Sequence, residues 1–225
     1  PAIPLQGANP VTRLIACLCV LIAASLIALP AAARTDPASF EHPQLIAIAE
    51  INSYLNAIVT LQGRFVQEAP DGRVTQGQFQ IEKPGKLRFQ YDPPAQMQII
   101  SDGLWVAIQD RKLDTSEKYP LVTTPLNLLL SRNVDLMRDA RILDVQAGED
   151  QVLLTLEERG PQSSGVLMLY FDPAAQELRR WTVTDVQGFD THIWLHDVVT
   201  NAPVDAAAFR IIENRVLEVG GAEAR

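Results

Sequence analysis

Hydrophobic and polar residues alternate with a period of two over most of the chain after residue 60, and this pattern restricts the fold most strongly. In Lys86–Asp92, Leu87, Phe89 and Tyr91 fall on one side and the polar residues on the other. Such alternation is typical of a β-strand with one buried and one solvated face. We expect about eleven such strands, at residues 62–68, 74–83, 86–92, 97–101, 104–109, 112–119, 141–146, 151–157, 165–172, 177–185 and 189–199.

Short turn sequences separate these strands. Asp102-Gly103 is the strongest hairpin signal, and Pro70–Gly72 and Pro84-Gly85 also predict turns. Strands joined by tight turns must be antiparallel, and the lack of a recurring helix between strands excludes a parallel βαβ sheet. The prediction is a mainly β fold, an incomplete, half-open antiparallel β-barrel with one apolar face.

Two segments follow a helical pattern instead. After Pro43, which is acceptable in a first helical turn, an apolar stripe runs at steps of three and four residues. Its members are Leu45, Ile48, Ile51, Leu55 and Ile58. The second segment contains Leu126, Leu128, Leu129 and Leu130, with Asn127 as its one polar residue. A helix that is apolar nearly all round must be buried on several sides or cover an apolar opening.

The start of the chain predicts export. Residues 14–29 carry no charge, follow Arg13 and precede Ala31-Ala32-Ala33, which is the arrangement of a signal peptide cleaved near Ala33. The apolar run is shorter than the ~20 residues that span a bilayer. Residues 14–17 (LIAC) also resemble a lipobox, but a lipobox ends its hydrophobic region and this one does not. We expect a signal peptide (1–33), a flexible leader (34–42), one domain (43–219) and a disordered tail (220–225).

Charge and cysteine content exclude several functions. The chain has a net charge of −8, which argues against binding nucleic acid or anionic lipid surfaces through charge. Both cysteines, Cys17 and Cys19, lie in the predicted signal peptide, so the mature domain contains no disulfide. If the protein handles lipids, apolar contact must provide the binding.

No common catalytic motif is present, and the histidines offer no metal site. His192 and His196 lie in a predicted strand, where four residues span about 13 Å at ~3.3 Å per residue. One ion with bonds of about 2.1 Å cannot join them. His42 stands alone, and the aspartates fall at turns and on solvated faces. We expect no catalytic residue, no metal and no cofactor.

The apolar strand faces allow two interpretations, an ordinary core or a ligand cavity. A strongly curved sheet can enclose more volume than its side chains fill. The predicted inward-facing residues are Leu87, Phe89, Tyr91, Met97, Ile99, Leu104, Val106 and Ile108.

Three segments resemble the LolA family of periplasmic lipoprotein carriers. They are KPGKLRFQYDPP (83–94), QIISDGLWVAIQD (98–110) and YPLVTTPLNLLL (119–130). LQGRFVQ (61–67) and APVDAAAFRI (202–211) fit the same family. No single motif is diagnostic, but their order and spacing are specific, and the resemblance extends from about Leu45 to Ile212.

The resemblance implies an eleven-stranded incomplete barrel whose apolar cavity is covered by short helices. Such a carrier accepts acylated lipoproteins from an inner-membrane ABC transporter of the LolCDE type. It releases them to an outer-membrane acceptor of the LolB type or to the membrane itself, and it hydrolyses nothing. We expect a monomer in which Leu126–Leu130 forms part of a lid above Leu87, Phe89 and Tyr91.

Lys83 departs from the family pattern. At this position the family has an arginine that hydrogen-bonds backbone carbonyls of the lid. Lysine presents a compact, strongly hydrated ammonium instead of a planar fork of donors. We hypothesise that Lys83 latches the lid less firmly and favours the open state; the alternative is a solvated lysine at a strand end.

Three other functions remain open at this point. The protein could carry other envelope lipids, or it could be a regulatory domain that senses lipoproteins. An envelope enzyme is disfavoured by the missing motifs.

Overall fold

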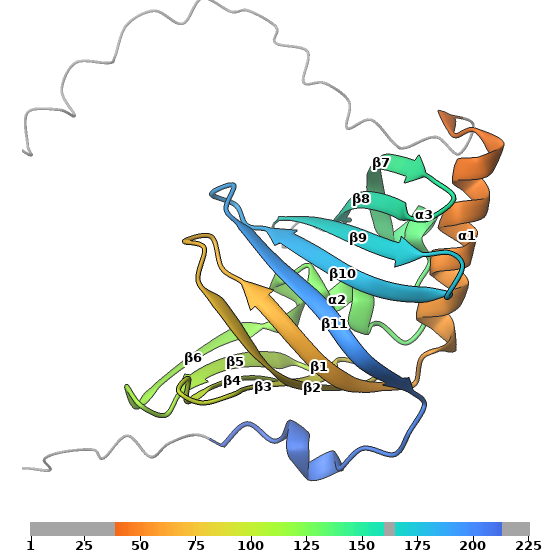
Figure 1. Ribbon diagram of the computed structural model, residues 1–225. Helices are drawn as coiled ribbons and strands as arrows, with labels where there is room; N and C mark the ends of the chain where they lie inside the picture. Colours follow the sequence, from red (N-terminus) through yellow and green to blue (C-terminus); the bar gives the residue numbers. More distant parts are fainter. Residues whose placement is uncertain (1–38, 160–164, 213–225) are drawn as a thin grey trace, which may run out of the picture. The chain divides into compact units, whose positions relative to one another are not determined.

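The structure of the chain is a computed structural model that describes residues 39–159 and 165–212. The predicted signal peptide, the first residues of the predicted leader and the predicted tail lie outside the described residues. Eleven strands form one antiparallel sheet in the order β6-β5-β4-β3-β2-β1-β11-β10-β9-β8-β7 (Figure 1). Their bounds are Thr60–Glu68 (β1), Val74–Glu82 (β2), Lys86–Tyr91 (β3), Met97–Asp102 (β4), Trp105–Asp110 (β5), Thr115–Pro120 (β6), Ala140–Ala147 (β7), Val152–Glu158 (β8), Val166–Asp172 (β9), Glu177–Thr184 (β10) and Asp190–Thr200 (β11).

The sheet does not close on itself. Among the described residues β6 and β7 each pair with one neighbour, so the sheet stays open between these two edge strands. The prediction of a mainly β, incomplete antiparallel barrel is confirmed. Strand β6 starts three residues later than predicted because Asp110 Oδ1 accepts hydrogen bonds from the backbone N–H groups of Lys112 and Leu113 and so fixes a turn there.

Helix α1 (His42–Ala57) packs on the inner face of β7–β10. The rings of Tyr54 and Phe171 meet edge to face at 5.4 Å, and Gln44 Nε2 donates to the Val145 carbonyl oxygen at 2.9 Å. Four residues of the predicted apolar stripe are buried, whereas Leu45, near the start of the helix, is 37% exposed. No helix among the described residues is long and apolar enough to cross a membrane.

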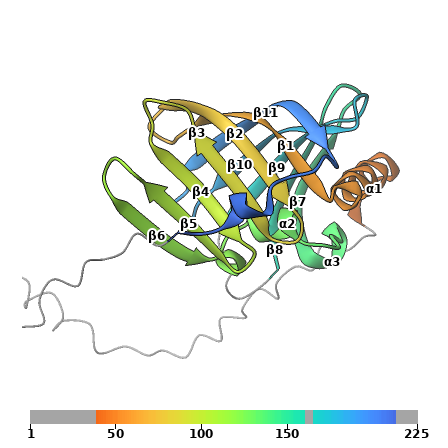
Figure 2. The same ribbon diagram turned by 90° about the horizontal axis from the view of Figure 1, so that it is seen from below.

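The connection from β6 to β7 passes across the opening of the sheet. It consists of the 3₁₀ helix η3 (Leu121–Thr123), α2 (Leu126–Leu130) and α3 (Leu136–Asp139). Helix α2 has the predicted bounds, whereas α3 was not predicted. In Figures 1 and 2, α1 and α3 lie side by side at one end of the sheet. Asn52 Oδ1 accepts a hydrogen bond from Leu136 N at 3.1 Å, which joins these helices.

One hydrophobic core joins both halves of the sheet. Phe65 on β1 contacts Phe89 and Tyr91 on β3, with ring centroids 4.6 and 5.0 Å apart. Phe89 also meets Trp181 on β10 at 6.2 Å. These aromatic contacts connect β1–β6 to β7–β11 across the concave side of the sheet, in addition to the β1–β11 pairing.

Candidate functional site

A small apolar cavity lies beneath α2, on the inner face of the sheet. It is lined by Tyr54, Leu55, Ile58, Leu61, Ile81, Lys83, Leu87, Leu126, Leu129, Leu130, Leu178 and Trp181. Its volume is about 30 Å³, which corresponds to roughly one water molecule. Sites for small molecules usually measure about 300–1,000 Å³. The protein's own side chains therefore nearly fill this space in the conformation observed.

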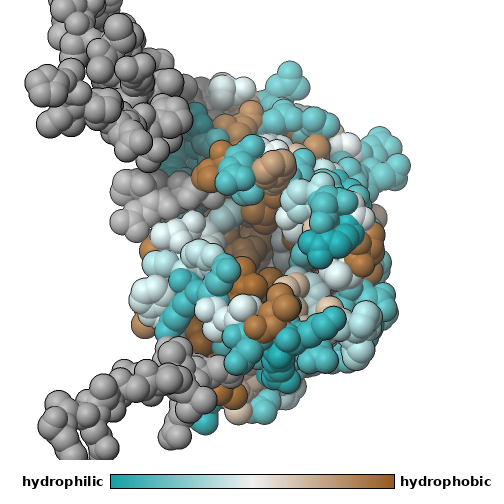
Figure 3. Space-filling model, turned by 90° about the vertical axis from the view of Figure 1, so that its left-hand side faces the viewer, coloured by the Kyte–Doolittle hydropathy of each residue, from teal (hydrophilic) through white to brown (hydrophobic). Residues whose placement is uncertain are grey.

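The same inner face is more open at the end of the sheet that carries the β1–β2 and β10–β11 turns. Figure 3 shows hydrophobic side chains in a hollow on this face, framed by hydrophilic residues. Met97 and Ile99 on β4 share the inner face with Phe89 and are only partly buried. Ile108, which pairs with Ile99, is 37% exposed. The apolar surface thus extends beyond the closed cavity.

Helix α2 covers the cavity and is held by few polar contacts. Leu128, Leu129 and Leu130 are buried, and Leu126 is half-buried. The backbone N–H of Gly85 donates to the Leu130 carbonyl oxygen at 2.8 Å. Burial of leucine side chains thus supplies most of the stabilisation of this short helix.

A second polar contact holds α2 to the opposite half of the sheet. Asn127 Nδ2 donates to Glu158 Oε1 on β8 at 2.6 Å. After α2, the side chain of Asn56 in α1 donates to the carbonyl oxygen of Val134 and accepts from its N–H, each at 2.8 Å. These bonds fix the ends of the connection, whereas α2 itself is fixed mainly by packing.

The hydrogen bond of Lys83 in the described structure goes to α1, whereas the predicted partner was the backbone of the lid segment α2. Its Nζ donates to the Leu55 carbonyl oxygen in α1 at 2.7 Å. The last four carbonyls of a helix have no donor within the helix, and a cation at this end also interacts favourably with the helix dipole. The last turn of α1 contains no basic residue, so Lys83 provides this charge from β2–β3. Gly85, two residues later, makes the contact with α2 instead.

Burial changes the ionisation of Lys83. Desolvation lowers the pKa of its ammonium to about 8. A lysine in water titrates near pH 10.4, so this group is close to neutralisation under mildly alkaline conditions. Lys83 is half-buried and its ammonium is bonded to Leu55, which differs from the alternative of a solvated lysine at a strand end.

The predicted wall residues fall into three groups. Leu87, Phe89, Tyr91 and Val106 are buried in the inner face, and Met97, Ile99 and Ile108 share that face nearer the open hollow. Leu104 lies in the β4–β5 turn and is 75% exposed, so its predicted inward orientation is wrong. Asp102 Oδ1 accepts hydrogen bonds from Leu104 N and Trp105 N, which ends the strand alternation before this residue.

Seven of the twelve residues that line the cavity were not predicted as site residues. Tyr54 and Leu55 lie in the last turn of α1, and Ile58 directly follows this helix. The others come from three strands: Leu61 from β1, Ile81 from β2, and Leu178 and Trp181 from β10. The sequence did show that α1 and β10 have apolar faces. That these faces meet α2 depends on contacts between segments more than 40 residues apart, which periodicity does not reveal.

The histidines lie apart from the cavity. His192 and Trp194 share the outer face of β11, where His192 Nδ1 is 2.8 Å from Thr182 Oγ1. His42 begins α1. Among the residues that the structure describes, no group of three or more His, Cys, Asp or Glu side chains is placed to hold a metal ion.

Comparison with known proteins identifies related carriers. The sequence profile of the family described as outer membrane lipoprotein carrier protein LolA matches residues 56–212. An outer-membrane lipoprotein carrier protein of Nitrosomonas europaea is 31% identical over 160 residues, covering 66% of this chain and 75% of that protein. One of Pseudomonas paraeruginosa is 29% identical over 177 residues, covering 72% and 82%. The crystal structure of a putative outer membrane lipoprotein-sorting protein domain from Vibrio parahaemolyticus covers 73% of this chain and 95% of that chain, with 10% identity and a TM-score of 0.45.

Proposed function

The chain belongs to the LolA family of outer membrane lipoprotein carrier proteins, and from this we propose that it carries acylated lipoproteins through the periplasm. It would receive them from an ABC transporter of the LolCDE type in the inner membrane. It would then deliver them, as a monomer and without catalysis, to an acceptor of the LolB type or to the outer membrane. Cleavage near Ala33 would release the exported chain.

The observation that carries this proposal is the apolar inner face beneath a short, weakly tethered helix. Each buried CH₂ group contributes about 0.8 kcal/mol, so a multiply acylated protein does not leave a bilayer unless a comparable apolar surface receives it. The inner face of β3–β5 and the leucines of α2 provide such a surface. We place the acyl chains along this face, from the hollow to the cavity.

Acyl binding requires a change in conformation, because the cavity of about 30 Å³ cannot hold a lipid chain. Displacement of α2 would expose Leu87 and its neighbours. Closure of α2 then competes with cargo, since a ligand that binds only the open form must shift the equilibrium away from the closed form. This competition would allow the carrier to release cargo to an acceptor.

The β2–β3 turn would hold two parts of the site separately. Lys83 stabilises the end of α1, which forms one wall, and Gly85 bonds α2, which moves. In Lys83→Met we expect faster amide exchange at residues 54–59 and little change at residues 126–130. Faster exchange confined to residues 126–130 would instead support the original hypothesis that Lys83 latches the lid.

Native mass spectrometry of the protein purified from a bacterial periplasm tests the proposed cargo. We expect co-purifying triacylated lipoprotein. Phospholipid alone would favour a carrier of other envelope lipids, and the protein without any lipid would contradict a carrier function.

Photo-crosslinking locates the cargo. A photoreactive amino acid at Leu129, in the cavity lining, should capture acylated lipoprotein in cells. The same group at Leu143 is a matched control, because this leucine is 44% exposed on the edge strand β7 and does not line the cavity. Equal capture at the two positions, or none at Leu129, would contradict the assignment of this cavity.

A further inference from the structure

The outer face of the sheet carries a row of polar side chains that runs across five strands. Cross-strand pairing places Arg64, Gln78, Gln90, Gln98 and Gln109 next to one another, from β1 to β5. A primary amide has two N–H donors and one oxygen acceptor. A row of such groups matches the donors and acceptors of a peptide backbone.

The chain's own C-terminal segment covers one half of this face. After β11, residues 201–212 include η4 (Ala206–Phe209) and lie over β3–β5. Arg88 Nη1 donates to the Ala208 carbonyl oxygen at 3.3 Å, and Gln109 Nε2 donates to the Ile212 carbonyl oxygen at 2.8 Å. Here the polar side chains of the sheet already bind a polypeptide through its backbone carbonyls.

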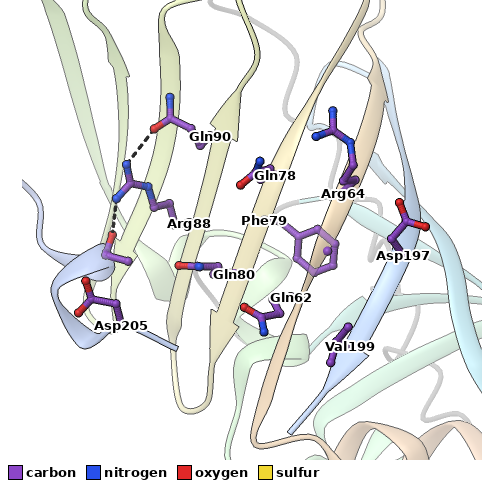
Figure 4. Close-up of a pocket in the computed structure, with 12 residues that line it drawn as sticks. Gln62, Arg64, Gln78, Phe79, Gln80, Arg88, Gln90, Asp197, Val199 and Asp205 are labelled. Carbon is purple, nitrogen blue, oxygen red and sulfur yellow. Dashed lines mark hydrogen bonds between the residues drawn. The ribbon is translucent and has the colours of Figure 1, made fainter. Parts of the chain in front are cut away.

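The other half of the face is an open groove over β1–β3. Its volume is about 600 Å³, within the range of sites that hold a ligand. Figure 4 shows Gln62, Gln78 and Gln80 along the floor, between the C-terminal segment with Asp205 and strand β11 with Asp197. Arg88 bonds Gln90 and the C-terminal segment, whereas within the described chain these three glutamine amides make no side-chain hydrogen bond.

The groove does not favour anions. Arg64 forms an ion pair with Asp92 at 2.5 Å, and the Arg88 guanidinium already donates to Gln90, Gln98 and Ala208. The side chains at its two rims, Asp197 and Asp205, are acidic. These carboxylates would repel an anionic ligand, whereas they would not repel an uncharged or basic one.

The groove is also poorly suited to sugars. The aromatic residue in its lining, Phe79, is 1% exposed and belongs to the core, so no ring is available for stacking on a sugar face. The groups that remain are amides with free donors and acceptors, similar to those that bind the C-terminal segment next to them.

We propose that this groove binds an extended, uncharged or basic segment of a partner polypeptide, through hydrogen bonds between the side-chain amides of Gln62, Gln78 and Gln80 and the N–H and carbonyl groups of its backbone. The site lies on the face of the sheet opposite to the apolar cavity, so it is separate from the proposed lipid site. Because recognition involves the backbone, binding tolerates different side chains in the partner.

A decapeptide of alternating threonine and glutamine with one central lysine is the probe. Titration into the ¹⁵N-labelled protein should shift the side-chain NH₂ signals of Gln62, Gln78 and Gln80 in a saturable manner. The same peptide N-methylated along its backbone should bind much more weakly, because it lacks the backbone N–H donors to the glutamine side-chain oxygens. Maltotriose and inorganic phosphate should not shift them either.

The paired variant Gln78→Leu/Gln80→Leu should weaken peptide binding about tenfold, since it removes two hydrogen-bonding groups. Gln76→Leu is the matched control, because Gln76 is on the same strand and face but outside the groove. Retained amide spectra show that each variant is folded. No saturable shift, equal binding of the N-methylated peptide, stronger binding of maltotriose or phosphate, or equal loss in Gln76→Leu would overturn the proposal.

Discussion

At the scale of single residues, Lys83 combines burial with a specific partner. Its Nζ lies 2.7 Å from the Leu55 carbonyl oxygen, and desolvation lowers its pKa to about 8. Helix α1 gains a cation at its C-terminal end, but the charge is held in poorly hydrated surroundings. The interaction of the cation with the helix end favours the folded state, whereas desolvation of the charge disfavours it. Because the charge is lost as the pH rises, the effect of the charge on stability can be measured by varying the pH.

The ionisation of Lys83 should be visible in a titration. The chain has four lysines, Lys83, Lys86, Lys112 and Lys118. We expect one ¹³Cε signal to titrate near pH 8, and Lys83→Met to remove that signal. Four signals that all titrate near the ordinary lysine value of about 10.4 would contradict the burial of this group.

Stability should follow the same pKa. Between pH 8 and the ordinary lysine value the unfolded chain binds more protons than the folded chain, so the contribution of Lys83 to the free energy of unfolding rises with pH. Below pH 8 both states are charged, and the cost of burial is fully present. Urea unfolding at pH 7.5 and 9.5 should show this gain in the wild type and in Lys112→Met, but not in Lys83→Met.

Gly85 is restricted by its backbone and by its neighbour. Its φ is +77°, and a Cβ atom would lie 2.7 Å from the Gly103 Cα. Gly72 has a similar φ of +78° with nothing within 4 Å. We expect Gly72→Ala to lower the free energy of unfolding by about 1 kcal/mol, and Gly85→Ala by about 3 kcal/mol. Equal losses in urea unfolding would contradict a steric role for the Gly85–Gly103 contact.

At the scale of elements, α2 is a five-residue helix too short to be stable alone. Its position depends on three buried leucines and on contacts at two points, Gly85 and Asn127. A single side-chain bond is therefore a large part of its tethering. This is the property expected of a cover that opens.

Asn127→Ala should favour the open form of α2. Loss of its hydrogen bond to Glu158 should speed amide exchange at residues 126–130. It should also lower the apparent Kd for a fluorescent long-chain fatty acid by about fivefold. Gln146→Ala is the matched control, because it removes an exposed amide–carboxylate bond, to Asp144, away from the cavity. Unchanged exchange and affinity in Asn127→Ala would show that α2 does not gate the apolar face.

At the scale of the whole described molecule, one core spans two halves of the sheet that are joined by a single strand pairing, β1 with β11. Phe89 contacts Phe65, Phe79 and Trp181, so its ring touches both halves. We therefore expect the halves to unfold together.

Hydrogen-exchange pulse labelling across a urea gradient tests this cooperativity. Peptides from β2–β5 and from β8–β10 should share one midpoint in the wild type. Phe89→Ala should shift both midpoints equally, with a loss of about 3–5 kcal/mol. Leu104→Ala should change stability by less than about 0.5 kcal/mol, because Leu104 is 75% exposed. Two separate midpoints would show that the halves are independent.

Periodicity along the chain was sufficient to predict the eleven strands, α1, α2 and the buried side of β3. Each of these predictions depends only on residues within one segment, and the alternation of Leu87, Phe89 and Tyr91 indicates which face of β3 is buried. Turn residues likewise showed that adjacent strands are antiparallel.

Only the tertiary structure decided which segments meet. It placed Leu55 rather than α2 opposite Lys83, brought Tyr54 and Trp181 into the cavity, and left Leu104 in solvent. The physical reason is that these contacts depend on the curvature of the sheet and on the path of the β6–β7 connection. Both arise from packing among all elements, whereas the alternation of side chains is a local property of each strand.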